Sequence, residues 1–324
     1  MSRQAPRVII HNDVTADMAG CLRTAMPDAA VTECNDYTGM AALVADFAPD
    51  VVYSVKFGGN AGFPTEVLMG PDGPGWVSVG GSGCDHLGAW DAGCKTVTNS
   101  AGVAAGMMAE YAFGCLLHFT LDIPGLATDR AAQHWNPLRR VVPLAGKTLL
   151  IIGLGQTGQA VAARAKAFGM HVIGTRARPA PLENVDEVHA ASDLPALCAR
   201  ADAIVVAVPL LPSTRNLVDA HTIAAMKPGV LLVDVSRGGV IEEAALIDAL
   251  KSGLIAGAGL DVFVQEPLPP DSPFWSLDSV ILSPHCSSVY DGWDLASFDM
   301  FIENLGRWRR DEPLRNIVNP ARGY

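Results

Sequence analysis

The chain has 324 residues, 49% of them hydrophobic and 18% charged, which is the composition of a globular protein with about two domains rather than of a disordered chain. Its formal net charge of -11 argues against nucleic acid or an anionic membrane as the main partner, so any bound anion needs a local basic group. The start of the chain has no signal-peptide pattern, no apolar run reaches the roughly 20 residues that cross a bilayer, and the seven cysteines are dispersed. We therefore expect a cytoplasmic protein with free thiols.

Two series of short apolar runs alternate with helical patterns, and this alternation predicts two α/β domains with parallel sheets. The runs of the first series are residues 8–10, 51–53, 76–79 and 96–98. A helical pattern over 104–119 and a polar arm over 128–142, which we also expect to be helical, separate the two series. The runs of the second series are residues 148–152, 171–174, 203–208, 230–234, 255–258 and 280–282.

A last helical pattern covers residues 293–309. If this helix packs on the first domain, the chain crosses between the domains twice and the first domain is discontinuous. We expect one domain from residues 1–100 and 287–324 and the other from residues 101–286. Because ligands of open α/β sheets bind beyond the carboxyl ends of the strands, we expect the chemistry in a cleft between the two domains.

A Gly-x-Gly-x-x-Gly pattern over residues 153–158 follows an apolar strand and opens a helical pattern over 159–168. The glycines alone would be a weak signal, but the strand before them and the helix after them are typical of a dinucleotide-binding turn. Gly153 would permit the tight turn, Gly155 would let the backbone approach a pyrophosphate, and Gly158 would let helix and strand pack closely. The start of the helix would then supply free N–H groups and its dipole to the diphosphate.

The next strand ends at Thr175 and is followed by Arg176 and Arg178. Enzymes that use NAD place an Asp or Glu here, about 20 residues beyond the glycines, to accept hydrogen bonds from the ribose hydroxyl groups. A guanidinium group cannot accept those bonds, but it pairs well with a 2′-phosphate. We therefore expect NADP(H) to be preferred, with NAD(H) possible; the alternative is that both arginines are solvated loop charges.

Three polar residues follow strands of the second series, namely Arg237, Glu266 and His285. Arg237 precedes two glycines that would let other groups approach, which suits an anion site. His285 alone among the eight histidines follows an apolar strand and a proline that fixes the path of the chain. The alternative for His285 is a histidine at a strand end that is bonded to the backbone.

Several segments occur together in a characteristic order and spacing. They are residues 83–87, 108–110, 153–158, 235–241, 260–269, 283–285 and 312–319. Together they resemble the D-isomer-specific 2-hydroxyacid dehydrogenases, and within that family the chain is similar to the glyoxylate/hydroxypyruvate reductases. The resemblance covers nearly the whole chain, and it implies a Rossmann doubly wound parallel-sheet cofactor domain with a smaller flavodoxin-like α/β substrate domain.

The resemblance implies NADPH-dependent reduction of small 2-keto acids, such as glyoxylate and hydroxypyruvate, to D-2-hydroxy acids, without a metal. Arg237 would clamp the substrate carboxylate and carbonyl oxygen, since its planar fork suits paired oxygens. His285 would be the general acid, and Glu266 would hold the imidazole and favour its protonated form. Backbone N–H groups of the loop that contains Ser82 and Gly83 would hold the carboxylate from the other domain.

Cofactor contacts are expected along the carboxyl edge of the second sheet. They are expected at Gly153, Gly155, Gln156, Thr157, Gly158, Thr175, Arg176, Arg178, Val208, Pro209, Thr214, Val235, Ser236, Asp261 and Ser287. Gln156 and Thr157 stand where the family usually has Arg-Ile, which would change the contacts to the pyrophosphate.

Two further expectations concern partners. In the family the region around residues 104–142 builds a two-fold dimer, so we expect a homodimer in which Trp135 reaches the partner's cleft; the alternative is a core helix followed by a surface loop. Some relatives act instead as dinucleotide-sensing corepressors with little turnover. A corepressor would retain the same three residues, so keto-acid-dependent oxidation of NADPH is needed to separate the two functions.

Overall fold

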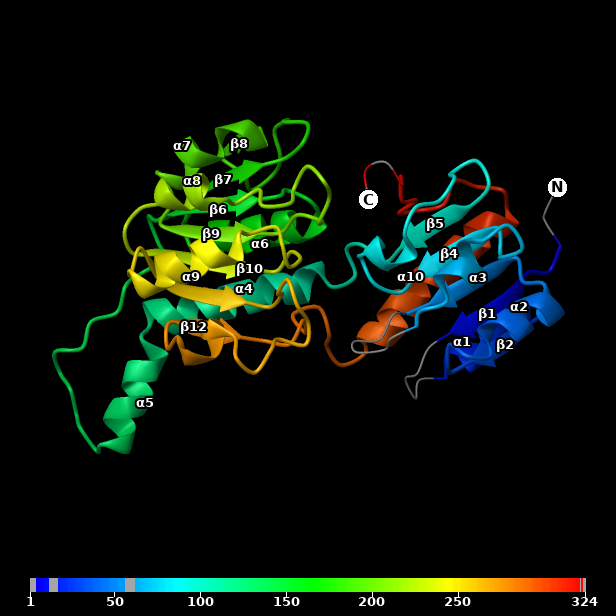
Figure 1. Ribbon diagram of the computed structural model, residues 1–324, viewed down its shortest axis with the longest axis horizontal. Helices are drawn as coiled ribbons and strands as arrows, with labels where there is room; N and C mark the ends of the chain where they lie inside the picture. The colour runs from blue at the N-terminus through cyan, green and yellow to red at the C-terminus, as the bar shows by residue number, and fades with distance from the viewer. Residues whose placement is uncertain (1–3, 12–16, 56–61, 321, 323–324) are drawn as a thin grey trace. The chain divides into compact units, whose positions relative to one another are not determined.

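The computed structural model describes residues 4–11, 17–55, 62–320 and 322. The chain forms two compact units, one from Met1–Val103 and Tyr290–Tyr324 and the other from Ala104–Val289. It therefore leaves the first unit after Val103 and returns after Val289, in each case three residues beyond the boundary expected from the sequence. Figure 1 labels the helices and strands of both units.

The first unit contains a five-stranded sheet in the order β2-β1-β3-β4-β5, with every pairing parallel. The strands are β1 (Arg7–His11), β2 (Ala30–Cys34), β3 (Val51–Ser54), β4 (Trp76–Val79) and β5 (Thr96–Asn99). The helices are α1 (Met18–Ala25), α2 (Met40–Phe47), α3 (Thr65–Met69) and α10 (Trp293–Arg309). This strand order is that of flavodoxin-like folds, which confirms the expected fold class of this unit.

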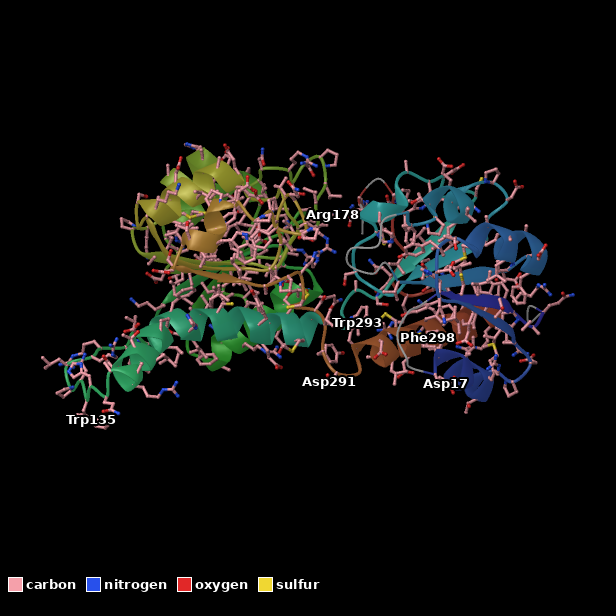
Figure 2. All side chains as sticks on the ribbon, turned by 60° about the horizontal axis from the view of Figure 1, so that its bottom comes forward. Asp17, Trp135, Arg178, Asp291, Trp293 and Phe298 are labelled. Atoms are coloured by element: carbon pink, nitrogen blue, oxygen red, sulfur yellow. The ribbon has the colours of Figure 1, made fainter. Side chains whose placement is uncertain are left out.

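Helix α10 packs into the core of the first unit although it follows the last strand of the second. Its Phe298, labelled in Figure 2, and Phe301 are buried. Their ring centroids lie 5.0 and 5.2 Å from that of Tyr53 on β3. The ring of Phe301 also lies 5.6 Å from that of Trp76 on β4. A helix near the end of the chain thus completes the core beneath strands from its beginning.

The second unit contains a seven-stranded parallel sheet in the order β12-β11-β10-β9-β6-β7-β8. The strands are β6 (Thr148–Ile152), β7 (His171–Thr175), β8 (Glu187–His189), β9 (Ala203–Val206), β10 (Val230–Asp234), β11 (Ile255–Leu260) and β12 (Val280–Leu282). The helices are α4 (Ala105–Thr120), α5 (Ile123–Ala131), α6 (Gln156–Ala167), α7 (Leu194–Cys198), α8 (Ala220–Ala224) and α9 (Glu243–Lys251). The first six strands have the Rossmann order, which confirms the expected class, and β12 extends the sheet.

Helices cover both faces of this sheet, so its strands are apolar on both sides. Alternate residues of β6 show the two layers. Leu149 and Ile151 pack in the cluster that contains α4 and α6, whereas Leu150 and Ile152 pack in the cluster that contains α7, α8 and α9. The strands are added outward from β6 first on one side, as β7 and β8, and then on the other, as β9, β10 and β11, so the order of the strands reverses between β6 and β9. The carboxyl ends of β6 and β9 therefore form the usual coenzyme-binding edge.

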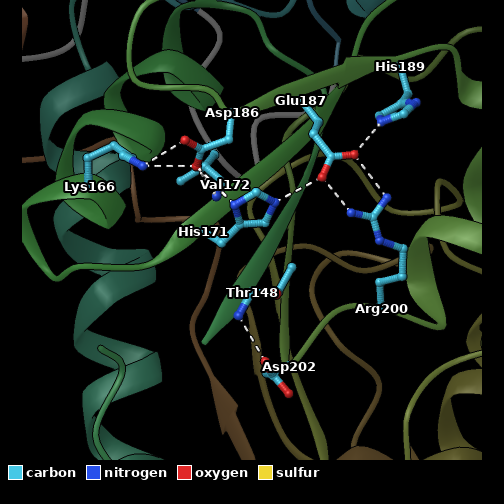
Figure 3. Close-up of polar contacts among 9 residues, drawn as sticks. All are labelled: Thr148, Lys166, His171, Val172, Asp186, Glu187, His189, Arg200 and Asp202. Atoms are coloured by element: carbon cyan, nitrogen blue, oxygen red, sulfur yellow. Dashed lines mark hydrogen bonds and ion pairs between the residues drawn. The ribbon is translucent and has the colours of Figure 1, made fainter. Parts of the chain in front are cut away.

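The edge strand β8 is held by a network of charges (Figure 3). The carboxylate of Glu187 accepts hydrogen bonds from Arg200 at 2.5 and 3.0 Å and lies 2.9 and 3.0 Å from ring nitrogens of His171 and His189. The bonds from Arg200, followed by those from the two histidines, hold the pKa of Glu187 well below its usual range. Charged side chains on an edge strand also discourage pairing with another chain.

An arm leaves the body of the second unit at α5, as Figure 1 shows. The expectation of a helix over 128–142 is wrong beyond Ala131, where α5 ends. Gln133 adopts a positive φ of 51°, which ends the helical path. The side chain of Asn136 then accepts a hydrogen bond from the N–H of Leu138 at 3.1 Å and so forms a turn around Pro137, which could not continue a helix. Trp135, at the end of the arm in Figure 2, is 90% exposed.

Smaller differences concern short or polar elements. Strands β2 and β8 have no counterpart among the expected apolar runs, because both are edge strands with few apolar residues. Strand β9 ends at Val206 rather than at residue 208, and α6 begins at Gln156 rather than at residue 159. Among the residues that the structure describes, no helix combines the length and the apolar character needed to cross a membrane.

Candidate active site

The glycine turn between β6 and α6 has the backbone geometry of a phosphate cradle. Gly153 has a φ of 106°, and a Cβ atom there would lie 2.6 Å from the carbonyl oxygen of Ala207. A Cβ atom on Gly158 would lie 2.0 Å from the carbonyl oxygen of Gly153, so helix and strand can approach only with glycine there. Gly155 precedes α6 without a side-chain cap, and a Cβ atom on it would meet no atom within 4 Å. Open space thus faces the uncapped N–H groups of α6, which fits a diphosphate.

The end of β7 presents two arginines next to this turn. Thr175 is buried, Arg176 is half-buried and Arg178 is exposed (labelled in Figure 2). The N–H of Arg176 donates to the carbonyl oxygen of His189 at 3.2 Å, which fixes the backbone at this point. In the part of the chain that the structure describes, neither guanidinium group forms an ion pair. Both groups are therefore available to an anionic ligand.

The other expected cofactor residues all lie in segments that follow strands of the second sheet. They are Val208, Pro209, Thr214, Val235, Ser236, Asp261 and Ser287. Three of their side chains already have partners within the protein. The hydroxyl of Thr214 donates to the carbonyl oxygen of Pro209 at 2.6 Å, that of Ser236 donates to Asp234 at 2.5 Å, and the Asp261 carboxylate accepts three hydrogen bonds. Any contact of Thr214, Ser236 or Asp261 with a coenzyme would therefore have to leave these internal hydrogen bonds intact or share them.

Arg237, Glu266 and His285 come together in the second unit. They follow β10, β11 and β12, which are neighbours in the sheet and end at the same edge. The Nδ1 atom of His285 lies 2.9 Å from Oε2 of Glu266, and its Nε2 atom lies 3.5 Å from Nη1 of Arg237. The three side chains therefore form a continuous polar group in which an imidazole stands between a carboxylate and a guanidinium.

Hydrogen bonds favour the ionised form of Glu266. Burial raises the pKa of this carboxyl group, but the bond from His285, the bond from the N–H of Phe263 at 3.0 Å and the nearby charge of Arg237 outweigh it, so the pKa lies below its usual range. An ionised carboxylate can only accept, so Nδ1 of His285 carries the hydrogen in this pair. The Nε2 atom then remains for chemistry beside Arg237.

Ser82 and Gly83 belong to the first unit, in the loop that follows β4. Two hydrogen bonds hold this loop in place. The side chain of Asn99 donates to the carbonyl oxygen of Ser82 at 2.7 Å, and the N–H of Ser100 donates to the carbonyl oxygen of Gly81 at 2.9 Å. Ser82 is exposed and Gly83 is half-buried. The loop is therefore a fixed backbone segment at the carboxyl end of a strand, where N–H groups can receive an anion.

Three polar residues that support this group were not predicted from the sequence. Asp234, at the end of β10, is 4% exposed and accepts hydrogen bonds from the N–H and the hydroxyl of Ser236 at 2.9 and 2.5 Å. Burial raises the pKa of Asp234 to about 7. Tyr111 on α4 and Ser283 after β12 form a hydrogen bond at 2.7 Å. An acid that ends an apolar strand, three residues before Arg237, was the available signal for Asp234. Nothing local in the sequence pairs Tyr111 with Ser283.

The exposed Cys286 next to His285 is not an activated nucleophile. Burial of the thiol and the nearby carboxylate of Asp261 raise its pKa, so little thiolate forms at neutral pH. Cys84 in the first unit is buried in a hydrophobic cluster.

Residues 113–287, more than half of the chain, match the family "D-isomer specific 2-hydroxyacid dehydrogenase, NAD binding domain". The chain is 38% identical over 225 residues to a D-3-phosphoglycerate dehydrogenase of Methanocaldococcus jannaschii, which covers 69% of this chain but 43% of that protein. It is 36% identical over 234 residues to a glyoxylate reductase of Korarchaeum cryptofilum, which covers 69% of both chains.

Among solved structures, a D-isomer specific 2-hydroxyacid dehydrogenase from Xanthobacter autotrophicus in complex with NADPH and MES matches with a TM-score of 0.84. That similarity covers 99% of this chain and 100% of the other, at 30% sequence identity. The chain therefore belongs to the D-isomer-specific 2-hydroxyacid dehydrogenase family.

Proposed function

We propose that this protein is an NADPH-dependent reductase that converts small 2-keto acids to D-2-hydroxy acids, with glyoxylate and hydroxypyruvate as the first candidate substrates. The observation that carries the proposal is the convergence of Arg237, Glu266 and His285, with Nδ1 of His285 on the carboxylate and Nε2 beside the guanidinium. A proton donor next to a fixed cation is what the reduction of a 2-keto acid requires.

Each residue has a distinct role in this chemistry. Arg237 binds the substrate carboxylate and polarises the carbonyl oxygen, and backbone N–H groups of the loop with Ser82 and Gly83 are proposed as further donors to a substrate carboxylate. His285 donates the proton on Nε2 to the carbonyl oxygen and is left neutral, and Glu266 keeps the imidazole oriented and stabilises its charged form before transfer. The bound coenzyme supplies the hydride.

The preference for NADP(H) is part of the proposal. The glycine turn fits a dinucleotide of either kind, since it offers backbone N–H groups to the diphosphate. Arg176 and Arg178 favour a 2′-phosphate, because no ion pair within the described residues occupies them and neither can accept bonds from a ribose hydroxyl. The relative from Xanthobacter autotrophicus was solved with NADPH. NAD(H) would be used with lower efficiency.

A homodimer is the proposed assembly. The arm and the helix end before it expose a set of large apolar side chains. They are Leu121, Ile123, Leu126, Trp135, Leu138, Val141 and Val142. Such a patch on a monomer is costly, and a second copy of the chain would cover it. Sedimentation should give twice the mass of the chain, and Trp135→Ser with Leu138→Ser should reduce it to the monomer.

The function is tested by following NADPH absorbance with a panel of keto acids: glyoxylate, hydroxypyruvate, pyruvate, bulkier 2-keto acids and 3-phosphohydroxypyruvate. We expect the highest kcat/KM for glyoxylate and hydroxypyruvate, and a higher kcat/KM for NADPH than for NADH. A preference for 3-phosphohydroxypyruvate would move the function toward that of the D-3-phosphoglycerate dehydrogenase relative. NADPH binding without any turnover across the panel would contradict the reductase and favour a dinucleotide-sensing binding protein.

A further inference from the structure

A chain of hydrogen bonds connects α4 with the turn that carries His285. The hydroxyl of Tyr111 lies 2.7 Å from the hydroxyl oxygen of Ser283, and Ser283 in turn donates to Oδ1 of Asp261 at 2.5 Å. A serine hydroxyl has one hydrogen to donate, and Ser283 donates it to the carboxylate of Asp261. Tyr111 must therefore be the donor in its bond to Ser283, so the chain runs in one direction, from tyrosine to serine to aspartate.

Asp261 is the point where this chain meets the turn. Its Oδ1 atom also accepts from the N–H of Cys286 at 2.8 Å, its Oδ2 atom accepts from the N–H of Ser287 at 3.0 Å, and its carbonyl oxygen accepts from the N–H of His285 at 2.9 Å. Three successive N–H groups of the turn are thus bonded to one residue. A small rotation of the Asp261 carboxylate would move the backbone that directly follows His285.

The turn needs such support because His285 has a φ of 54°. This left-handed conformation is uncommon for a residue with a Cβ atom, and it persists only where the surrounding bonds hold it. The neighbouring carboxylate is well placed for this task, since Asp261 is 1% exposed and Ser287 is 3% exposed, where hydrogen bonds are little weakened by water.

Tyr111 remains a donor across the working range of the protein. Burial raises the pKa of its hydroxyl group, and the nearby Cys115 and Asp261 act in the same direction. The tyrosine is half-buried on α4, its hydroxyl is hydrogen-bonded to Ser283, and within the described residues no hydrogen bond joins it to Glu266 or His285. Its influence on the reacting groups can therefore pass only through its neighbours.

We propose that Tyr111 is a positioning residue: its hydroxyl group orients Ser283 and Asp261, which fix the turn of residues 283–287 so that the imidazole of His285 faces Glu266 and Arg237. The kinetic consequence of this inference rests on the proposed reductase function, whereas the geometric consequence does not. Tyr111 itself touches neither substrate nor coenzyme in this proposal.

The test compares Tyr111→Phe, Ser283→Ala and the double variant. Tyr111→Phe keeps the ring and removes one hydroxyl group, so we expect kcat to fall about tenfold, equivalent to about 1.4 kcal/mol in the barrier. Tyr37→Phe removes the same group from a tyrosine that packs against His11 in the first unit, and it should leave kcat unchanged. The pH dependence of kcat should shift in Tyr111→Phe and not in the control.

Because both single variants interrupt the same chain, the double variant should be no slower than Ser283→Ala alone. The positioning role would be overturned if the losses of kcat in the two single variants multiplied in the double variant. It would also be overturned if Tyr111→Phe lowered the melting temperature but kept the kcat and the pH profile of the wild type. If the wild-type protein turns over no keto acid, the proposed function fails and the inference is tested separately. In protein labelled with 15N-histidine, the ring signals of His285, assigned with His285→Gln, should move in Tyr111→Phe, and unmoved signals would overturn it.

Discussion

Asp234 offers a test of how the second unit tolerates an acid beneath its candidate active site. The carboxyl group is 4% exposed, its hydrogen bonds come from Ser236, and the carboxylate of Asp261 lies near enough to disfavour a second negative charge. The perturbation is Asp234→Asn, which removes the charge and keeps an oxygen that can accept both bonds from Ser236.

The magnitude follows from the pKa. Burial raises the pKa of Asp234 from 3.8 to about 7, against the opposing effect of the bonds from Ser236. Since the folded-state pKa lies above the unfolded one, the neutral carboxyl group favours folding at low pH, and that contribution is lost as the pH rises through about 7. A shift of this size corresponds to at most about 4 kcal/mol of unfolding free energy.

The assay is equilibrium urea unfolding of the wild type and the variant at about pH 4, close to the unfolded-state pKa, and at about pH 8.5, above the folded-state pKa. At the lower pH the two proteins should have similar stability, because the protonated acid and the amide are close in shape. At the higher pH Asp234→Asn should be the more stable, by up to about 4 kcal/mol. Asp219→Asn is the matched control: Asp219 caps α8 through the N–H of Thr222 and its pKa is lowered, so its replacement should bring no gain at high pH. An Asp234→Asn protein that is less stable at high pH, or that keeps the pH slope of the wild type, would refute the reasoning.

Four further outcomes are expected. His285→Ala should lower kcat by about 10²–10⁴-fold while NADPH still binds, since general acid catalysis is lost; an enzyme with near-normal kcat would exclude the assignment. Glu266→Gln should move the acid limb of the kcat profile, because its carboxylate has a lowered pKa and stays ionised below its usual range; an unaltered profile would count against the pair. Arg176→Ala should raise the KM for NADPH about tenfold and leave that for NADH unchanged, whereas equal losses for both would indicate a structural effect. Glu187→Gln should lower the unfolding free energy by about 1 kcal/mol, or the melting temperature by about 2–4 °C, at neutral pH. This difference from the wild type should shrink as the pH falls below the ordinary range of a glutamate, since the stabilising effect of the charge is then lost. A difference that stays constant with pH would point to packing.

The fold class could be predicted because strands that are buried on both faces consist of uninterrupted runs of apolar residues. The central strands of the second sheet, such as 148–152 and 230–234, have this form, and the glycine turn marks where the first of them ends. Strand β2 could not be found in this way, because only Cys34 among its five residues is buried. A half-exposed edge strand does not need an apolar run, and its place is decided by the neighbour it pairs with.

Much of the candidate site could also be predicted, because parallel strands bring their carboxyl ends to one edge. Arg237, Glu266 and His285 are therefore expected to be neighbours before any distance is known. The residues beneath them could not be predicted. The bond between Tyr111 and Ser283 joins positions 172 apart in sequence, and the raised pKa of Asp234 depends on burial that only tertiary packing creates.

The place of α10 also bears on how the protein is made. The second unit is contiguous in sequence and can become complete while the ribosome is still adding the last part of the chain. The N-terminal sheet, although synthesised first, must wait for Phe298 and Phe301 before Tyr53 and Trp76 are covered. During translation the older half of the molecule should therefore be the one that exposes aromatic surface and needs the protection of chaperones.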